Sequence, residues 1–404
     1  MDEIAVFCPD LYKRAKQGDV DAQNFVGWSY YCIGVFKKAF TWYKRAAEQG
    51  DSDAQYNLGK LFFTGEGTKV NYLKAKEWYE KAAVQGNVDA QFNLASMYFN
   101  GNGVEKSYEN ARDLYKIAAE NGSVSAQFAL GEMYEKGDGI GQNKVIAKDW
   151  YEKAKVEYEQ LSETDNSDAM YHLGLIYYYG KGVDKDCVKG KSWFEEAAVQ
   201  ENADAQFELG YIYQYGVGVE VDCAKAKYWY KKAARNRNVD AKYYLGFMFY
   251  LGQGVEQSYL KAEYFLNSAA NQLEVAAEQG NAEAQNRLGK IYYCCKHEYA
   301  TARIWYEKAA IQGVADAQYH LGLMYYYGKG IERNYVKSKE WFEKSAKQAH
   351  PKSQFNLGVM YENGKGVEQD YDKAQIWYKK AMKQGNKNAM KALEELYIKI
   401  HGDT

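Results

Sequence analysis

DAQFELGYIY, residues 204–213, contains the pattern that decides the fold of this 404-residue chain. Its alanine, leucine, glycine and last tyrosine recur at the second, sixth, seventh and tenth positions of other segments. A fixed period of 20–50 residues is the signature of a repeat protein, in which each unit packs only on its neighbours. Copies begin, most often 36 residues apart, at Asp21, Asp53, Asp89, Ser125, Asp168, Asp204, Asp240, Glu283, Asp316 and Lys352, and a half-copy begins at Asn388.

Each unit is predicted to form two helices. In the third copy, apolar residues fall on two stripes with helical spacing. Gly101 follows the first stripe, where a helix commonly ends in a left-handed residue. Gly122 closes the second, and Ser123 or Ser125 can cap the next helix. The stripes are formed by Ala90, Leu94, Met97 and Tyr98, and by Ala111, Leu114, Tyr115, Ala118 and Ala119.

A longer pattern recurs in phase with these stripes. In the second copy it reads Leu58-Gly59, Gly65-x-Gly67, Ala75, Trp78-Tyr79, Ala82-Ala83 and Gly86. This pattern resembles Sel1-like repeats, a longer-turn relative of the tetratricopeptide repeat, over residues 21–387. The resemblance implies an all-α fold: a right-handed α/α superhelical solenoid of ten helix-turn-helix repeats. It further implies that the first helices line the concave side, and that the protein is a non-catalytic adaptor or scaffold.

Four repeats depart from the common length. The first and eighth lack the Gly-x-Gly turn, so we expect tighter turns between their helices and a change of superhelical pitch. The fourth and seventh carry seven extra residues each, near 156–162 and 274–280. Seven residues add about two helical turns and keep the apolar stripe in phase. We therefore predict longer second helices in these two repeats, projecting on one edge.

The two ends are expected to be caps. Residues 1–20 are predicted to contain an N-terminal capping helix, residues 21–387 the ten repeats, and residues 388–404 a C-terminal capping helix. Atypical end units are expected in a solenoid, because an ordinary end repeat would expose an apolar side. On this basis the chain is expected to be nearly complete.

Composition narrows the functional classes. The chain has 52 Lys and Arg against 54 Asp and Glu. Its net charge of −2 therefore lacks the excess of positive charge that is typical of proteins that bind nucleic acid. No stretch approaches the ~20 apolar residues of a membrane span, and the N-terminus does not read as a signal peptide. We expect a cytoplasmic protein without membrane insertion. The six cysteines, among them Cys187 and Cys223 at one position of adjacent repeats, are expected to be free thiols.

The 40 tyrosines suggest where function lies. Counting from the first residue of each copy, positions 2, 6, 7 and 10 are predicted to be core, and the family resemblance places positions 4, 8, 11 and 12 on the concave surface. From the fifth repeat onward these four positions become aromatic. A large exposed apolar surface marks an interaction site, and tyrosine is enriched at binding hot spots. The alternative is that the rings pack on one another between repeats. The predicted partner-binding residues are Tyr171, Leu175, Tyr178, Tyr179, Tyr211, Tyr215, Tyr243, Phe247, Tyr250, Tyr293, Tyr319, Leu323, Tyr326 and Tyr327.

Motifs that suggest chemistry have structural explanations. The Gly-Lys-Gly segments at 180–182, 328–330 and 364–366 lack the strand and the Gly-Lys-Ser/Thr of a phosphate loop, so we interpret them as turns. Cys294-Cys295-Lys296-His297 has no second ligand pair for zinc. His172 and His320 occupy one position of repeats four units apart. We predict no metal, no cofactor and no catalytic residue.

Several functions remain open. The favoured one is a scaffold or adaptor that binds a protein or peptide, as a monomer, in the aromatic groove. A narrower version, suggested by bacterial relatives, is an immunity protein that neutralises a cognate toxin. An enzyme acting on β-lactams would need paired cysteines within each repeat and an export signal, which we do not find. A cell-envelope component would need a signal or lipid anchor.

Overall fold

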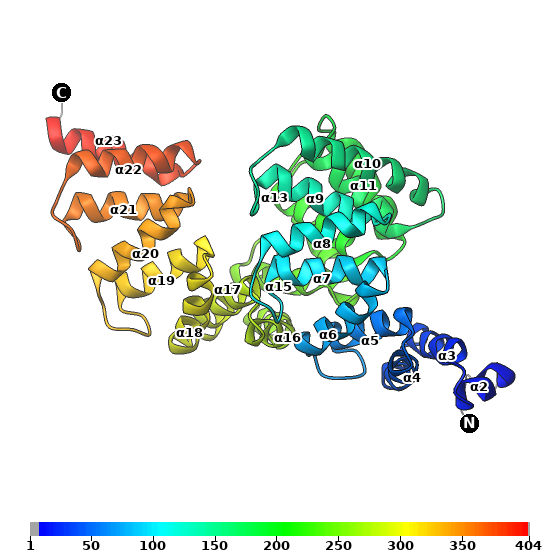
Figure 1. Cartoon of the computed structure of the whole chain (residues 1–404). Coiled ribbons are helices and arrows are strands. Elements are labelled where there is room, and N and C mark those ends of the chain that lie inside the picture. The colour runs from blue at the N-terminus through cyan, green and yellow to red at the C-terminus, as the bar shows by residue number, and fades with distance from the viewer. Residues whose placement is uncertain (1–7, 403–404) are drawn as a thin grey trace. The chain divides into compact units, whose positions relative to one another are not determined.

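The computed structural model describes residues 8–402 and is helical throughout the repeats, with no strand in that range (Figure 1). The chain divides into two compact units, residues 1–265 and 266–404. Residues 1–7 and 403–404 of the predicted end caps lie outside the described residues. Ten repeats each contribute two helices. The first helices are α3 (Val20–Cys32), α5 (Ser52–Thr64), α7 (Val88–Asn100), α9 (Val124–Lys136), α11 (Ser167–Tyr179), α13 (Ala203–Tyr215), α15 (Val239–Leu251), α17 (Ala282–Ile291), α19 (Ala315–Tyr327) and α21 (Pro351–Asn363).

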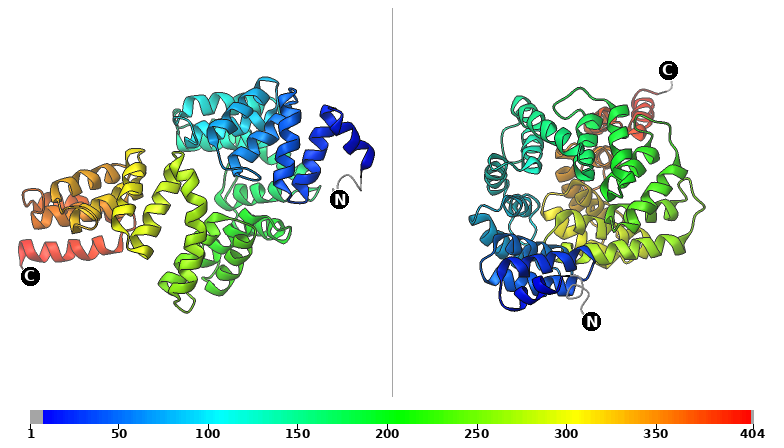
Figure 2. Two further views of the ribbon diagram at one scale, coloured as in Figure 1. Left: turned by 90° about the horizontal axis from the view of Figure 1, so that it is seen from below. Right: turned by 90° about the vertical axis from the view of Figure 1, so that its right-hand side faces the viewer.

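The second helices pack back against them, and neighbouring helices within each unit run antiparallel (Figure 2). Helix α2 (Pro9–Lys16) precedes the repeats and α23 (Lys387–His401) follows them. The second helices are α4 (Phe36–Glu48), α6 (Tyr72–Val84), α8 (Tyr108–Glu120), α10 (Lys144–Ser162), α12 (Cys187–Val199), α14 (Cys223–Arg235), α16 (Tyr259–Glu278), α18 (Tyr299–Ile311), α20 (Tyr335–Lys347) and α22 (Tyr371–Lys383).

Helix ends follow the predicted signals. Gly101, with φ of 73°, ends α7 in the left-handed region, and the hydroxyl of Ser123 caps α9 by accepting a hydrogen bond from the Ala126 amide at 3.3 Å. The turns of the first and eighth repeats are short, as predicted. Only residues 33–35 separate α3 from α4, and in the eighth repeat a π-helical turn, η1 (Tyr292–Lys296), leaves two residues before α18.

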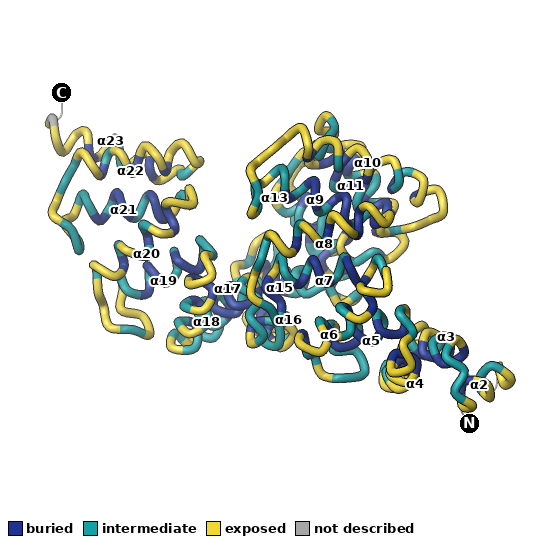
Figure 3. The backbone as a smooth tube through the Cα atoms, in the orientation of Figure 1, coloured by how far each residue is buried: buried dark blue, intermediate teal, exposed yellow. Residues whose placement is uncertain are grey.

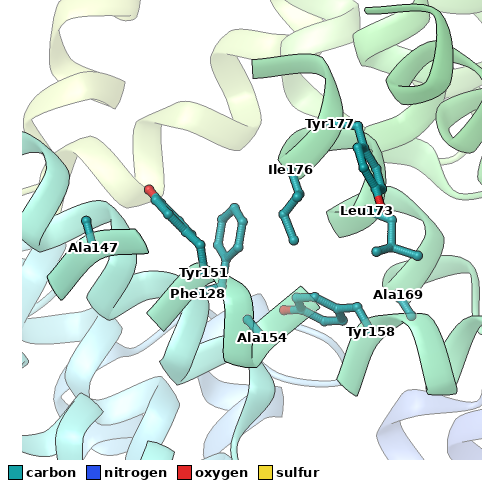
Figure 4. Close-up of a cluster of buried hydrophobic side chains, with 9 residues drawn as sticks. All are labelled: Phe128, Ala147, Tyr151, Ala154, Tyr158, Ala169, Leu173, Ile176 and Tyr177. Atoms are coloured by element: carbon teal, nitrogen blue, oxygen red, sulfur yellow. The ribbon is translucent and has the colours of Figure 1, made fainter. Parts of the chain in front are cut away.

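The longer second helices are confirmed. Helix α10 has 19 residues and α16 has 20, whereas α8 has 13. In α10 the extra turns carry Tyr158 into the core, where its ring lies 6.4 Å from Phe128 and stacks on His172 at 4.6 Å (Figure 4). The added residues therefore extend the apolar stripe of this helix.

Within each unit the core consists of small packed clusters rather than one centre (Figure 3). Position 9 is fully buried in nine repeats, although the sequence placed it on the apolar stripe only in the third copy, at Met97. Position 10, which was predicted as core, is only half-buried in several repeats, as at Tyr98 and Tyr134. The buried position-9 residues are Leu61, Met97, Met133, Ile176, Ile212, Met248, Ile291, Met324 and Met360.

Candidate functional site: the first helices

Glycine at position 7 sets how closely the two helices of a repeat approach. A Cβ on Gly210 would lie 2.5 Å from the ring of Tyr230, and one on Gly174 would lie 2.4 Å from the ring of Phe194. Such distances are too short for any side chain, so the ring of the second helix lies flat on the glycine backbone. This contact fixes the rotation of the first helix, and with it the direction of every residue on its other faces.

Buried glutamines at position 3 join successive helices. Gln206 donates from Nε2 to the carbonyl of Ala198 at 3.0 Å, and its Oε1 accepts from Asn236 at 3.1 Å. A buried polar side chain is stable only when its hydrogen bonds are made. Sequence reasoning missed this role, because the acceptor belongs to the preceding helix. The same bond to an alanine carbonyl is made by Gln23, Gln55, Gln91, Gln285, Gln318 and Gln354.

The structure separates the predicted binding residues into three groups. Tyr179, Tyr215 and Tyr327 are 44%, 51% and 62% exposed. Tyr178 and Tyr243 are buried. The others are half-buried between neighbouring helices: Tyr171, Leu175, Tyr211, Phe247, Tyr250, Tyr293, Tyr319, Leu323 and Tyr326.

The placement of Tyr178 on an open surface was therefore wrong. Its ring lies 5.8 Å from Phe194, and its hydroxyl donates to the backbone carbonyl of Val217. Burial raises the pKa of Tyr178 to about 12. Tyr243 was misplaced for the same reason, because its ring packs on Phe247 at 4.8 Å. Tyr178 joins two repeats and Tyr243 packs on a ring of its own helix, so both are packing residues, as the alternative supposed.

Position 11 contacts the Gly-x-Gly turn of the next repeat. Lys365 donates from Nζ to the hydroxyl of Tyr326 at 3.0 Å, and Gln214 donates to Gln253 at 3.3 Å. Lys329 lies over the ring of Tyr293 at 5.4 Å. The lysines of these Gly-Lys-Gly turns therefore bind side chains of the preceding repeat, which agrees with a structural role for the turns.

The exposed residues at position 12 form a regular row in the first unit. Tyr179, Tyr215 and Leu251, which we call the position-12 row, end the first helices of three consecutive repeats and are 44%, 51% and 54% exposed. Helix α11 contacts α13, and α13 contacts α15. Leu251 was not among the predicted residues, although its position equals that of Tyr179.

Two polar or aromatic neighbours shape this row. The hydroxyl of Tyr179 donates to Oε2 of Glu208 at 3.1 Å, and burial raises the pKa of the Glu208 carboxyl. The rings of Tyr211 and Tyr215 lie 4.6 Å apart. The row therefore consists of side chains with an apolar face and a nearby hydrogen-bonding group.

A second exposed aromatic pair lies at the start of the same unit. Phe25 and Trp28 of α3 are 47% and 53% exposed, with ring centroids 5.4 Å apart. They occupy positions 5 and 8 of the first repeat. Sequence reasoning missed them because it compared only the later, tyrosine-rich repeats.

The groups that could support chemistry are buried or packed. Burial raises the pKa of both Cys294 and Cys295, which disfavours the reactive thiolate. His320 stacks on Tyr306 at 4.9 Å, and burial lowers its pKa. All six cysteines are free thiols. Within residues 8–402, no group of three His, Cys, Asp or Glu side chains could hold a metal ion, and none of the helices is long and apolar enough to cross a membrane.

Comparison with solved structures gives related repeat proteins. A protective antigen present in uropathogenic Escherichia coli strains, displaying an SLR fold, is 32% identical over 97% of this chain and 90% of its own, with a TM-score of 0.49. A Sel1 repeat protein from Oxalobacter formigenes is 30% identical over 79% of this chain and 90% of its own, with a TM-score of 0.42. An immunity protein from Pseudomonas aeruginosa is 23% identical over 54% of this chain and 81% of its own, with a TM-score of 0.37.

No curated protein matches the sequence. The family model described as Sel1 repeat matches ten segments between residues 20 and 386, which follow the helix pairs of the structure. Because these ten matches cover most of the sequence, the chain belongs to the Sel1 repeat family.

Proposed function

We propose that this protein is a non-catalytic scaffold that binds a partner protein or peptide on its first helices. The position-12 row is the observation that carries the proposal. Three consecutive first helices expose a large apolar side chain at the same position, on helices that contact one another. Single exposed apolar residues are common on any protein, but a periodic series of them is characteristic of a binding surface.

The spacing of the row suits an extended polypeptide. Helices in contact pack ~8–10 Å apart. A chain in the polyproline II conformation advances ~3.1 Å per residue with three residues per turn, so every third residue of such a ligand would face the next member of the row. Tyr179 and Tyr215 would supply rigid apolar faces, and their hydroxyl groups could bind the ligand backbone.

The other features of the chain support the same class. The free thiols fit a reducing compartment, so we infer that binding takes place in the cytoplasm. The row lies within one chain, so a monomer is sufficient. The immunity-protein alternative predicts that the bound partner is a toxin; the Pseudomonas immunity protein shares the fold only, so the identity of the partner decides between the two.

The test is to recover the tagged protein from its native cells and identify what it binds in stoichiometric amount. A row variant, Tyr179→Ala, Tyr215→Ala and Leu251→Ala, should lose that partner while keeping its helicity; loss of the hydrogen bond to Glu208 should lower its melting temperature without unfolding it. The matched control, Val84→Ala, Val199→Ala and Tyr228→Ala, removes side chains that are 89%, 74% and 53% exposed on second helices and should retain it. Equal recovery with both variants would refute the row as the binding surface.

A further inference from the structure

A recurring hydrogen bond links the starts of neighbouring repeats. Asn238, which caps α15, donates from Nδ2 to Oδ1 of Asp204 at 2.8 Å. Asp204 is position 1 of the repeat before it. The same asparagine-to-aspartate bond, also 2.8 Å long, joins Asn202 to Asp168 and Asn87 to Asp53. In each pair the acceptor precedes the donor by 34 residues.

This bond is missing at the C-terminal end of the second unit. Position 1 of the tenth repeat is Lys352, and the equivalent asparagine is Asn386, the cap of α23. Asn386 donates instead to the carbonyl of Pro351 at 3.3 Å. A cation thus occupies the place where Asp53, Asp168 and Asp204 supply a carboxylate.

A cavity of about 470 Å³ lies beside this position. Its size is typical of pockets that hold small groups of a ligand, which occupy ~300–1,000 Å³. Two lysines, three asparagines and two aromatic residues line it, and none of its lining residues is acidic. It is lined by Tyr319, Pro351, Lys352, Phe355, Asn356, Gly385, Asn386, Lys387 and Asn388.

Both lysines of the cavity are exposed. Within residues 8–402, neither Lys352 nor Lys387 forms an ion pair with a carboxylate, and Lys352 lies over the Tyr319 ring at 5.9 Å. The acid closest in sequence to this wall, Asp316, is already flanked by the Nε2 atoms of His320 and His350, at 3.7 and 3.8 Å. The half-buried rings of Tyr319 and Phe355 provide an apolar wall.

We propose that this cavity binds a carboxylate of a polypeptide ligand, which takes the place of the missing position-1 aspartate beside Lys352 and Lys387. The apolar part of the same ligand residue packs on Tyr319 and Phe355. The inference rests on the proposed function and adds the chemistry of one anchor on the partner. A carboxylate is favoured over other anions because carboxylates occupy the equivalent place in the repeats that keep the bond.

The key variant is Lys352→Asp in the full chain. It restores the residue found in most other repeats, so Asn386 can form the regular bond and the fold should be kept or made more stable. The control, Lys379→Glu, makes the same change of charge at an exposed position of α22 that does not line the cavity. A library of random peptides, half with free and half with amidated C-termini, is selected for binding to the wild-type chain. The affinity of each selected peptide for the wild type and for each variant is then measured by fluorescence anisotropy.

The expected result is a class of selected peptides that depends on an Asp, a Glu or a free C-terminus. That class binds at least tenfold more weakly to the Lys352→Asp protein and unchanged to the control. Binding of the same peptides to the row variant, Tyr179→Ala, Tyr215→Ala and Leu251→Ala, tests the proposed function separately. The inference is overturned if the selected peptides lose binding to the row variant but need no carboxylate. It is also overturned if they bind the Lys352→Asp protein as tightly as the wild type. Either result leaves the proposed function standing. Failure to select any peptide counts against both.

Addition of inorganic phosphate distinguishes the source of the anion. Millimolar phosphate should compete weakly with the acidic peptides, because it has the charge without the apolar contact. Phosphate binding to the wild-type chain in place of any acidic peptide would overturn the assignment of a polypeptide carboxylate.

Discussion

The hydroxyl of Tyr178 donates to the backbone carbonyl of Val217, the residue between the two glycines of the next turn. Tyr179 is its neighbour in sequence, yet it is 44% exposed, whereas Tyr178 is 2% exposed. Both hydroxyl groups reach the next repeat, Tyr178 at Val217 and Tyr179 at Glu208, but only the ring of Tyr179 is exposed to solvent.

This difference can be tested with two matched changes. Tyr178→Phe leaves the buried carbonyl of Val217 without its donor and should lower the free energy of unfolding by about 1 kcal/mol. Tyr215→Phe removes a hydroxyl from a half-exposed ring and should change stability by less than about 0.5 kcal/mol. Chemical denaturation of both variants provides the comparison, and equal effects would contradict the assigned roles.

The buried glutamines should be needed for stability. Gln206→Met leaves the carbonyl of Ala198 with the Glu201 amide as its remaining donor and removes an acceptor of Asn236, so the free energy of unfolding should fall by about 1 kcal/mol. Gln142→Met, in an exposed turn, is the control and should cost less than about 0.5 kcal/mol. Denaturant midpoints measure both, and a Gln206→Met protein as stable as the wild type would show that the bond contributes little.

Glycine at position 7 should not accept a methyl group. Gly210→Ala forces the new Cβ against the ring of Tyr230, and overpacking of this kind costs about 1–3 kcal/mol. Adding Tyr230→Leu makes room, so the double variant should be more stable than the sum of the single effects predicts. A double-mutant cycle on the free energy of unfolding measures that coupling; strict additivity would contradict the contact.

His320 should make the protein less stable in acid. Burial lowers the pKa of His320, with opposition from Asp316 and support from Lys290, Lys352 and His350. The unfolded chain therefore binds the proton more readily than the native one below the ordinary histidine pKa of about 6.5, so stability is lost as pH falls below that value.

The variant that checks this is His320→Phe, which keeps a ring to stack on Tyr306. Its melting temperature should fall less steeply between pH 6.5 and about 4.5 than that of the wild type. Because His350 also has a lowered pKa, part of the slope should remain. Parallel curves for the two proteins would count against a buried neutral His320.

The sequence predicts the architecture well because the repeat period reports local geometry. Ten copies in phase, the glycine that ends α7 and the seven added residues near 156–162 were sufficient to predict helix pairs, their ends and the longer α10. Each of these features depends on the backbone of a single segment. The family resemblance then extends the local pattern to a solenoid.

The surface is harder to predict because exposure depends on the neighbouring repeat. Tyr178 and Tyr179 are both aromatic and adjacent, and only the turn that contains Val217 buries the first of them. Leu251 was passed over, although its exposure equals that of Tyr215 within a few percent. Composition by position therefore mixed packing residues with surface ones.

The most direct test of the central claim is the dissociation constant of the purified partner for three proteins: the wild type, the row variant and the second-helix control. Truncation of a tyrosine at the centre of a binding site typically weakens the free energy of binding by more than about 1–2 kcal/mol. The row variant should therefore bind the partner at least about tenfold more weakly. The control should match the wild type. If the row variant binds as tightly as the wild type, the partner does not rest on Tyr179, Tyr215 and Leu251, and the proposed binding surface is wrong.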